Sequence, residues 1–520
     1  MMLEGMENMS NCTEEGCRLN AFNDYDKCIL HCKKEDYVTD WNKLGFLQAF
    51  YDALLIEIHQ KFIDNILIKK QKSIQYLTDP DILLRDLRNP EKRIEGYIQL
   101  NSIKFPGWHV RDTFNYVALL SRLGSIHFIS CNFQTSSLEI RETKLFFQNC
   151  QFNNNWQVAI HNLLPNENNV LYQKCEFNGD VNCLPTNGIV QINITLFRDC
   201  NFQKELNFSE LELKSPIFNN TSSLSTRINI FTVKNTAINS KFVLNNCTFD
   251  KFISVDSVFT SKFEFKENEV KTFLVTNSNF EGLFDAYKTR FTYFEMQKII
   301  CSDFVGFEHC DFGIKNDSSM ELVPRFLYAT FMSFVNFRNT KFYSGLDIEH
   351  INFKESPNFL NSEITPQNSN RETFRIIKNS FDEIGNHLEA NNYFIFEMKK
   401  YKEELDNSNK YQEKLIFFLN EKVSNFGQSY LRPLGLMVAF SIVYYILVLG
   451  YENEILYKIF PPANSLINSI SAFSNDISKN ILPFSKFLNK GMEFISLVFY
   501  VIYASLIWQI LVSVKRHTRR

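Results

Sequence analysis

The stretches Phe128-Ile-Ser-Cys131-Asn-Phe133 and Phe147-Gln-Asn-Cys150-Gln-Phe152 follow one template. Two large apolar residues stand five places apart, and a small residue lies two places before the second of them. Copies recur every roughly 20 to 30 residues, with a wider gap between Cys200 and Cys247, and such spacing is typical of stacked solenoid coils. The further copies are Tyr172–Phe177, Phe197–Phe202, Leu244–Phe249, Val275–Phe280, Phe307–Phe312 and Phe337–Phe342.

The fold class that this repeat predicts is mainly β, a parallel β-helix over residues 97–365. The repeat also explains the composition, because Phe accounts for 52 of the 520 residues and Gly for only 17. An ordinary β-sandwich with Phe-rich strands is the alternative. We favour the solenoid, because a sandwich gives no reason for the small-x-Phe spacing to persist through all the copies.

The template resembles that of the pentapeptide-repeat proteins, in which a central Leu or Phe and a small residue two places earlier point into the coil. The resemblance implies a right-handed quadrilateral β-helix, here a degenerate one, because only about two pentapeptides per coil are legible. It also implies that the Cys residues of the repeat are small buried residues that pack in the core. These residues are Cys131, Cys150, Cys175, Cys200, Cys247 and Cys310.

Four Cys and one His lie within the first 32 residues, in a segment that is otherwise polar. Two close pairs joined by a short loop suit the tetrahedral coordination of a structural Zn²⁺. The spacing leaves open whether His31 or Cys32 is the fourth ligand, and a disordered tail with incidental Cys is the alternative. No apolar segment of a secretory signal precedes them, so we expect a reducing, cytoplasmic environment. The candidate zinc ligands are Cys12, Cys17, Cys28, His31 and Cys32.

Apolar residues at three- and four-residue intervals predict helices on both sides of the repeat. Leu47, Leu54 and Ile58 mark a helical cap, and Asp382–Asn386 interrupts a later helical segment that should form an antiparallel pair. A third helix is expected over 410–422. The predicted parts are a zinc knuckle at 1–39, the helical cap at 40–96, the β-helix at 97–365, a cytoplasmic helical hairpin at 366–424 and a membrane module at 425–520.

Two uncharged apolar stretches, Leu434–Gly450 and Phe494–Val514, are each long enough to cross the hydrocarbon core of a bilayer. Buried helices of a globular domain are the alternative. The basic tail that begins at Lys515 favours a cytoplasmic C terminus under the positive-inside rule. Two spans return the chain to its starting side. We therefore expect an inner-membrane protein whose termini and β-helix are cytoplasmic.

A set of residues in the last part of the chain carries a second resemblance. The residues are Phe374, Arg375, Lys378, Glu389, Ala390, Asn391, Phe394, Glu397, Met398, Tyr401, Ser424–Gly427, Ser429, Arg432, Pro433 and the basic tail. In this pattern residues 371–520 look like the C-terminal module of bacterial membrane-anchored pentapeptide-repeat proteins. The resemblance implies an anchor and carries no biochemical activity with it.

The net charge and the motifs of the sequence restrict the range of possible functions. The 55 Lys and Arg against 58 Asp and Glu give a net charge of −3, too balanced for a general nucleic-acid binder or an acidic DNA mimic. The sequence holds no phosphate-binding loop, dinucleotide motif, zinc-protease motif or nucleophile elbow, so we expect neither an enzyme nor a small-molecule substrate. The predicted function is a non-enzymatic, membrane-anchored cytoplasmic scaffold or sensor that presents its β-helix to a protein partner. The alternative is a homo-oligomeric membrane effector or pore, with the semi-apolar stretch Asn464–Phe473 re-entering the membrane.

Overall fold

The computed structural model of the protein divides into two compact units, Met1–Asn368 and Ser369–Arg520. The first holds a β-solenoid with an N-terminal Cys/His cluster, and the second is helical. The residues that the structure describes are 11–22, 26–33, 43–69, 79–89, 91–107, 113–140, 142–160, 163–166, 168–185, 188–221, 226–317, 319–406, 409–452, 465–479 and 489–518.

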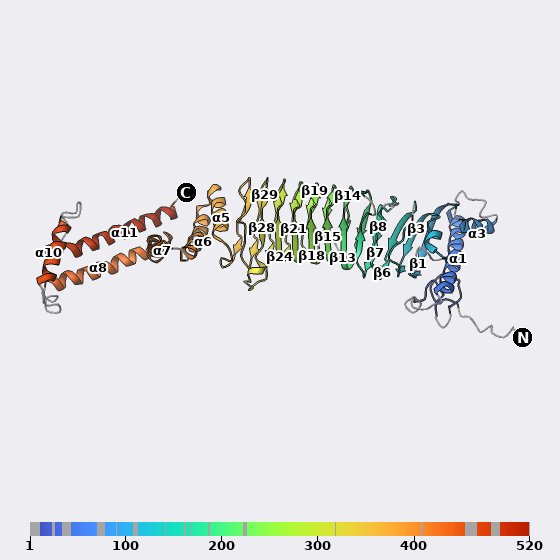
Figure 1. The fold of residues 1–520 in the computed structure, drawn as a ribbon, viewed down its shortest axis with the longest axis horizontal. Helices are drawn as coiled ribbons and strands as arrows, with labels where there is room; N and C mark the ends of the chain where they lie inside the picture. The colour runs from blue at the N-terminus through green and yellow to red at the C-terminus, as the bar shows by residue number, and fades with distance from the viewer. Residues whose placement is uncertain are drawn as a thin grey trace. The chain divides into compact units, whose positions relative to one another are not determined.

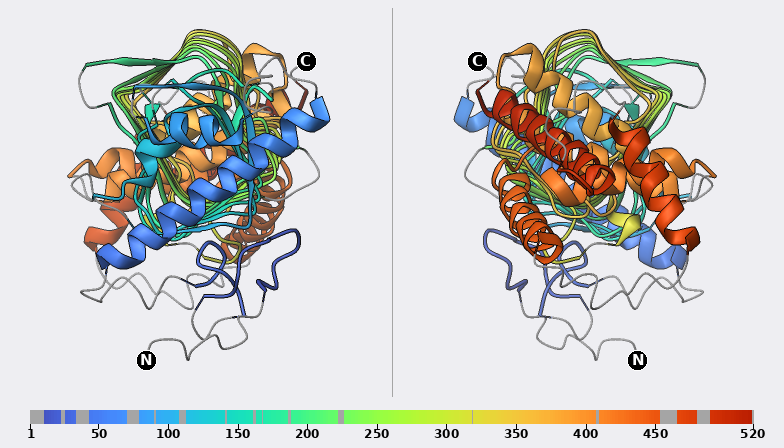
Figure 2. Two further views of the ribbon diagram at one scale, coloured as in Figure 1. Left: turned by 90° about the vertical axis from the view of Figure 1, so that its right-hand side faces the viewer. Right: turned by 90° about the vertical axis from the view of Figure 1, so that its left-hand side faces the viewer.

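The solenoid consists of about 11 turns whose strands pair in parallel. Viewed along the stack, the successive coils superimpose (Figure 2). The central path of a 15-stranded sheet crosses the whole stack: β2 (Lys104–Phe105), β4 (Asn132–Phe133), β6 (Gln151–Phe152), β9 (Glu176–Phe177), β13 (Asn201–Ser209), β15 (Thr226–Lys234), β18 (Cys247–Val255), β21 (Glu269–Thr276), β24 (Arg290–Gln297), β27 (Asp311–Phe312), β31 (Lys341–Phe342) and β33 (Glu363–Ile364).

Three further sheets close the coils (Figure 1). Short strands β7 (Trp156–Gln157), β10 (Val181–Cys183) and β28 (Arg325–Leu327) extend the first sheet. The second contains β1 (Ile94–Asn101), β3 (Leu123–Ile129), β5 (Lys144–Gln148), β8 (Val170–Gln173) and β12 (Thr195–Arg198). The third contains β11 (Val190–Ile192), β14 (Leu211–Leu213), β16 (Ala237–Ile238), β19 (Val258–Phe259), β22 (Asn279–Phe280), β25 (Ile300–Cys301), β29 (Ala329–Phe331) and β32 (Ile351–Phe353). The fourth contains β17 (Phe242–Val243), β20 (Phe263–Glu264), β23 (Phe284–Asp285), β26 (Val305–Gly306) and β30 (Val335–Asn336).

The register of the strands explains the irregular spacing of the repeat. Through β18, β21, β24 and β27, hydrogen-bonded positions in neighbouring coils are 21 residues apart. Thr226 pairs with Cys247, so a coil lacking the Cys and the Phe fills the wide gap in the sequence pattern. The copy Val275–Phe280 runs from β21 of the first sheet to β22 of the third, whereas the copy Phe147–Cys150–Phe152 leads into the first sheet. The template therefore marks two corners of the coil and not one.

The polar residue of the template forms the corner. Residues directly before the small residue adopt the left-handed conformation, with φ of 54° at Asn149 and 58° at His309. Asn and Asp tolerate this region better than other non-glycine residues, which fits a chain rich in turns and poor in Gly. Others at this corner are Ser130, Lys174, Asp199, Asn246, Glu267, Lys288 and Asn339.

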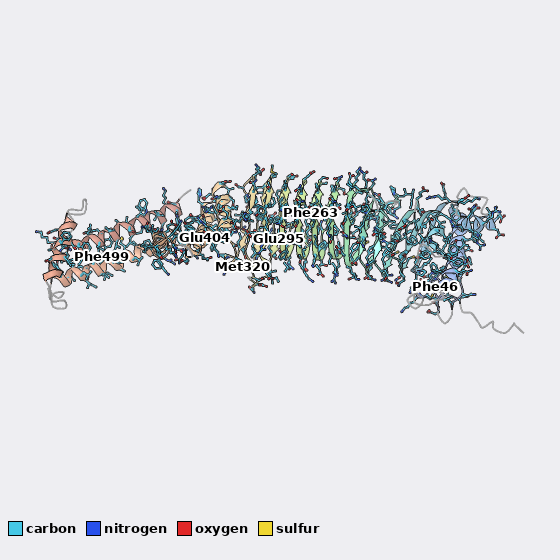
Figure 3. All side chains as sticks on the ribbon, in the orientation of Figure 1. Phe46, Phe263, Glu295, Met320, Glu404 and Phe499 are labelled. Carbon is cyan, nitrogen blue, oxygen red and sulfur yellow. The ribbon has the colours of Figure 1, made fainter. Side chains whose placement is uncertain are left out.

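Aromatic side chains fill the solenoid in stacked columns. In one column Phe133 lies 4.9 Å from Phe152, and Phe152 lies 4.6 Å from Phe177, with rings nearly parallel. In another, Phe263 lies between Phe242 and Phe284 at 4.9 and 4.8 Å (Figure 3 labels Phe263). The side chains of both columns are fully buried, and the repeat predicts this for the first column. Offset stacking of this kind adds to the free energy gained from burial.

Helices cover the N-terminal end of the solenoid. They are α1 (Lys43–Lys69), α3 (Pro80–Arg88) and the short α4 (Tyr116–Leu120). Phe50 of α1 packs against Phe105 and Tyr116, with ring centres 6.0 and 5.4 Å apart. Gly96 lets α1 approach β1, because a Cβ there would lie 2.6 Å from the Phe62 ring. The predicted Leu47, Leu54 and Ile58 are buried.

The second unit begins with the predicted helix pair, α5 (Arg371–Glu383) and α6 (His387–Asp406). Contacts of Phe381 with Tyr393 and of Arg371 with Glu404 show that the pair is antiparallel. The turn between them contains Gly385 at φ 77°. Next come α7 (Tyr411–Ser424), α8 (Leu431–Glu452), α10 (Ser465–Lys479) and α11 (Glu493–Thr518).

Helices α8 and α11 contain the two predicted apolar stretches and are long and apolar enough to cross a membrane. The apolar stretch of α8 has no buried residue, and that of α11 is 22% buried. The helices meet through the Tyr444 hydroxyl, which lies 3.0 Å from Ser496 Oγ, and through the Phe440 and Phe499 rings. Residues 453–464 and 480–488, which lie between these two helices and include the start of the predicted re-entrant stretch, and the last two residues of the basic tail lie outside the described residues.

Candidate metal centre

Two short segments bring four of the predicted ligands together. Cys12 and Cys17 lie on segment 11–22, and Cys28 and His31 on segment 26–33. The backbone N–H of Thr13 donates to Asp26 O at 3.0 Å, which joins the segments. A turn in which the His31 N–H donates to Cys28 O at 3.0 Å aligns these two ligands.

The donor atoms lie close to the spacing of a tetrahedral site. Cys12 Sγ lies 3.6 Å and Cys28 Sγ 3.1 Å from His31 Nδ1, and Cys17 Sγ lies 3.6 Å from Cys28 Sγ. All four donor atoms lie within 4.8 Å of one another. Ligands at the usual Zn–S and Zn–N distances form a tetrahedron with edges of about 3.6 to 3.8 Å. The residues therefore fit a four-coordinate metal ion.

Cys32 is placed differently. It is buried, and its Sγ lies 3.8 Å from Ile29 O, outside the group of four donor atoms. The geometry thus favours His31 over Cys32, the choice that the spacing left open.

Burial and charge set the chemistry of the cluster. Cys12, Cys28 and His31 are buried and Cys17 is half-buried. Desolvation raises the pKa of the Cys17 and Cys28 thiols, since burial disfavours a bare thiolate. A bound cation compensates such charge, so metal binding and thiol deprotonation are coupled. Four protein ligands leave no open coordination position for a substrate.

The cluster is attached to the first coil. His31 Nε2 lies 3.3 Å from the carbonyl oxygen of Asn101, at the end of β1. With Nδ1 facing the thiols, the Nε2–H donates to that carbonyl and fixes the orientation of the ring, as is usual for metal-binding His. The backbone N–H of Lys104 donates to Leu30 O at 2.9 Å. No sequence signal pointed to Asn101 or Lys104, which act through backbone atoms.

The Cys residues of the repeat have another role. Each is buried, and the thiols of Cys150 and Cys175 donate to the carbonyl oxygens of Phe128 and Phe147 in the preceding coil, both at 3.5 Å. Burial raises the pKa of the Cys175 and Cys310 thiols well above the usual range. These thiols pack in the core, as the resemblance implied.

Two hollows on the solenoid surface are lined by ionic residues that pair with one another. Arg290 lies 2.9 Å from Glu269, and Lys271 lies 2.6 Å from Asp250. His309 is exposed, with Nε2 3.3 Å from Asn339 Nδ2, in agreement with an outward corner position. These ion pairs neutralise part of the charge that lines the hollows.

Comparisons of the chain with protein-family models, with curated proteins and with solved structures find no match.

Proposed function

We propose that the protein is a non-enzymatic scaffold or sensor that presents its β-solenoid to a protein partner at the cytoplasmic face of the inner membrane. The observation that carries the proposal is the joining, in one chain, of a solenoid to a pair of long apolar helices. A stack of coils with filled interiors offers a long, ordered outer surface, which is how solenoids bind proteins.

The charge pattern of the outer surface favours a protein as the partner and not a nucleic acid. Along the central sheet the outward residues alternate in sign, so that Arg290 contacts both Glu269 and Asp311, and Lys341 contacts Glu363. Nucleic-acid binding needs an excess of cations on one face. Exposed ion pairs contribute little to stability and leave a mixed polar surface suited to protein recognition.

Helices α8 and α11 are the proposed membrane anchor of the chain. We propose that both helices span the membrane, with Lys515 and the residues after it on the cytoplasmic side, together with the solenoid and the N terminus. The exposure of the apolar stretch of α8 supports a lipid environment over a buried core helix.

We propose that Zn²⁺ fills the Cys12, Cys17, Cys28 and His31 cluster and has a structural role. A segment this polar gains its order from the metal, and the contact of His31 with Asn101 then holds it on the first coil. We further propose the right-handed coil of pentapeptide-repeat-like proteins, because parallel crossovers strongly prefer that hand.

A second candidate, a homo-oligomeric pore, has one observation in its favour. Helix α10 lies between the spans in sequence and is held on α11, where the Phe494 N–H donates to Asn475 Oδ1 at 2.9 Å. A short helix in this place resembles a re-entrant segment. Its exposed Ile470 and Phe473 fit lipid contact equally well.

Photo-crosslinking in cells distinguishes the two functions. A benzophenone amino acid is placed, one position at a time, at outward residues of the solenoid from Gln151 to Lys341, at the exposed Ile470 of α10, and at Tyr445 on α8 as a lipid-facing control. A scaffold gives a discrete heterologous adduct from a contiguous set of solenoid positions and none from Tyr445. Adducts between copies from α10, together with dye release from reconstituted vesicles, would support the pore instead.

A further inference from the structure

Helix α7 exposes apolar side chains along one side. This is the reverse of a helix on a soluble protein, whose apolar side faces the core. The exposed residues and fractions are Tyr411 (77%), Leu415 (60%), Ile416 (56%), Phe418 (49%) and Leu419 (49%).

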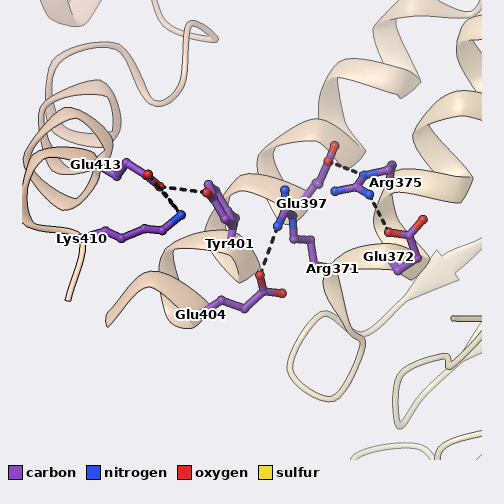
Figure 4. Close-up of polar contacts among 8 residues, drawn as sticks. All are labelled: Arg371, Glu372, Arg375, Glu397, Tyr401, Glu404, Lys410 and Glu413. Carbon is purple, nitrogen blue, oxygen red and sulfur yellow. Dashed lines mark hydrogen bonds and ion pairs between the residues drawn. The ribbon is translucent and has the colours of Figure 1, made fainter. Parts of the chain in front are cut away.

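The opposite side of α7 carries polar residues around Phe417, which packs on Tyr401 and Phe426, and it is fixed by contacts within the helical unit. Glu413 accepts a hydrogen bond from the Tyr401 hydroxyl at 3.1 Å (Figure 4), and Glu421 pairs with Lys402 at 2.6 Å. The Lys402 ammonium group lowers the pKa of Glu421. Asn420 Oδ1 accepts from Gln509 Nε2 at 2.9 Å. Because these groups need their partners, α7 cannot turn its apolar side inward at low cost.

The connection to α8 sets the direction of α7. Three consecutive left-handed residues, Asn425, Phe426 and Gly427, make a sharp turn before α8 begins at Leu431. A Cβ on Gly427 would lie 3.3 Å from Arg516 Nη1, so the turn is closely packed against α11. In Figure 1, α7 is seen nearly end-on while α8 and α11 run across the view, so α7 crosses the direction of the two spans.

The exposed apolar surface continues onto α8. Leu431, Leu434 and Val438 are exposed there, next in sequence to the turn. Lys410 and Lys422, near the two ends of α7, are exposed. A helix crosswise to a span, apolar on one side and with lysines at its ends, has the features of a helix in the membrane interface.

We propose that α7 lies in the interfacial region of the bilayer, with Leu415, Ile416 and Phe418 toward the acyl chains and its lysines among anionic headgroups. The proposal rests on the proposed anchoring by α8 and α11. A bilayer covers α7 and the start of α8 with one apolar medium, whereas a second copy of the chain covering α7 would leave Leu431 and Leu434 to be covered separately. The contact also fixes α6 at the membrane surface through Lys402 and Tyr401.

The test uses the full chain, reconstituted into vesicles of phosphatidylethanolamine and phosphatidylglycerol. A small environment-sensitive fluorescent amino acid replaces one of three exposed isoleucines: Ile416 on α7, Ile442 in the middle of α8, or Ile189 on the solenoid. Ile416 and Ile442 are equally exposed, at 56%, which makes them a matched pair. Lipids with a nitroxide near the headgroup or deep in the acyl chain serve as quenchers.

The proposal predicts that the shallow quencher removes more than about half of the Ile416 signal and that the deep one removes much less. Ile442 should show the opposite order, and Ile189 should respond to neither. If the probe at position 416 is not quenched while the probe at position 442 is, the α7 proposal is wrong and the anchoring by α8 and α11 still holds. A blue-shifted emission from the unquenched probe at position 416 would then show that a second copy of the chain covers α7. Stronger quenching of Ile416 by the deep lipid also overturns it. No quenching of Ile442 contradicts the anchoring itself.

Discussion

At the scale of single residues, substitutions at inward positions of the solenoid should lower the free energy of unfolding much more than substitutions at outward positions. Phe152 is fully buried between Phe133 and Phe177, whereas its neighbour Gln151 is exposed and bonds to Glu176 at 3.3 Å. Phe152→Ala leaves a cavity and should lower the free energy of unfolding by about 3 to 5 kcal/mol. Gln151→Ala should change it by less than about 0.5 kcal/mol.

Urea midpoints of a fragment ending at Asn368, where the first compact unit ends, measure this contrast. Equal losses for the two variants would show that the inward and outward assignment is wrong. Enlarging Cys150 to Leu should also destabilise, by about 1 to 3 kcal/mol, since the filled column cannot expand.

The corner residues give a second prediction at this scale. Lys174 has φ of 52° directly before Cys175, a conformation that costs a residue with a Cβ about 1 kcal/mol or more. Lys174→Gly relieves this cost and should keep stability within about 0.5 kcal/mol, while Lys174→Val should lose about 1 to 2 kcal/mol. Gln173→Gly, one place earlier in β8, is the control and should lose about 1 kcal/mol. A Val variant as stable as the Gly variant would contradict the left-handed corner.

At the scale of elements, the α5 and α6 pair depends on one buried carboxylate. Glu397 lies 3.2 Å from Arg375 and 3.0 Å from Lys378 (Figure 4 shows the Arg375 contact). Glu397→Gln removes the carboxylate that pairs with Lys378 and leaves Arg375 with Glu372 alone, at 2.7 Å, and should cost about 2 kcal/mol after allowance for the solvation of the two cations. Glu404→Gln breaks the exposed pair with Arg371 and should cost less than about 1 kcal/mol.

Thermal unfolding of the full chain in detergent, followed by far-ultraviolet circular dichroism, measures the helical transition. If Glu404→Gln lowers the midpoint temperature of that transition as much as Glu397→Gln does, the burial of Glu397 does not strengthen its ion pairs and the prediction is wrong.

The elements also show how far the sequence predicts the structure. A Phe with a small residue two places earlier identifies inward positions, because that volume pattern is what the core requires. The pattern missed the corner at Asn268, where an amide replaces the Cys. The Asn268 Nδ2 donates to Leu244 O at 2.8 Å, and its Oδ1 accepts from the Cys247 N–H at 2.7 Å. A polar residue fits this core only through partners in the neighbouring coil.

Orientation was the harder part to predict. The spacing of Leu415, Phe418 and Leu419 places them on one side of α7, but the contacts of Glu413 and Asn420 with other helices decide which side faces outward. The attachment of His31 to Asn101 joins residues 70 places apart through a backbone carbonyl, which leaves no mark on the sequence. The choice between His31 and Cys32 needed the donor distances.

At the scale of the whole molecule, zinc should order the N-terminal segment without supporting the solenoid. Elemental analysis should give about one Zn²⁺ per chain, and Cys12→Ser should lose it while Cys32→Ser, whose sulfur lies outside the cluster, should retain it. Protease should then cut the Cys12→Ser variant near its N terminus and leave the solenoid resistant. Less than about a tenth of an equivalent in metal-replete protein would exclude the site.

The central claim is that one chain places the solenoid and both termini on the cytoplasmic side of a two-span anchor. Alkaline phosphatase, which is active only outside the cytoplasm, tests it most directly when fused after Arg520 or inserted in the segment between α8 and α10. We predict an inactive fusion after Arg520 and an active one in the inserted segment. Strong phosphatase activity after Arg520 would contradict the two-span arrangement and the cytoplasmic scaffold with it.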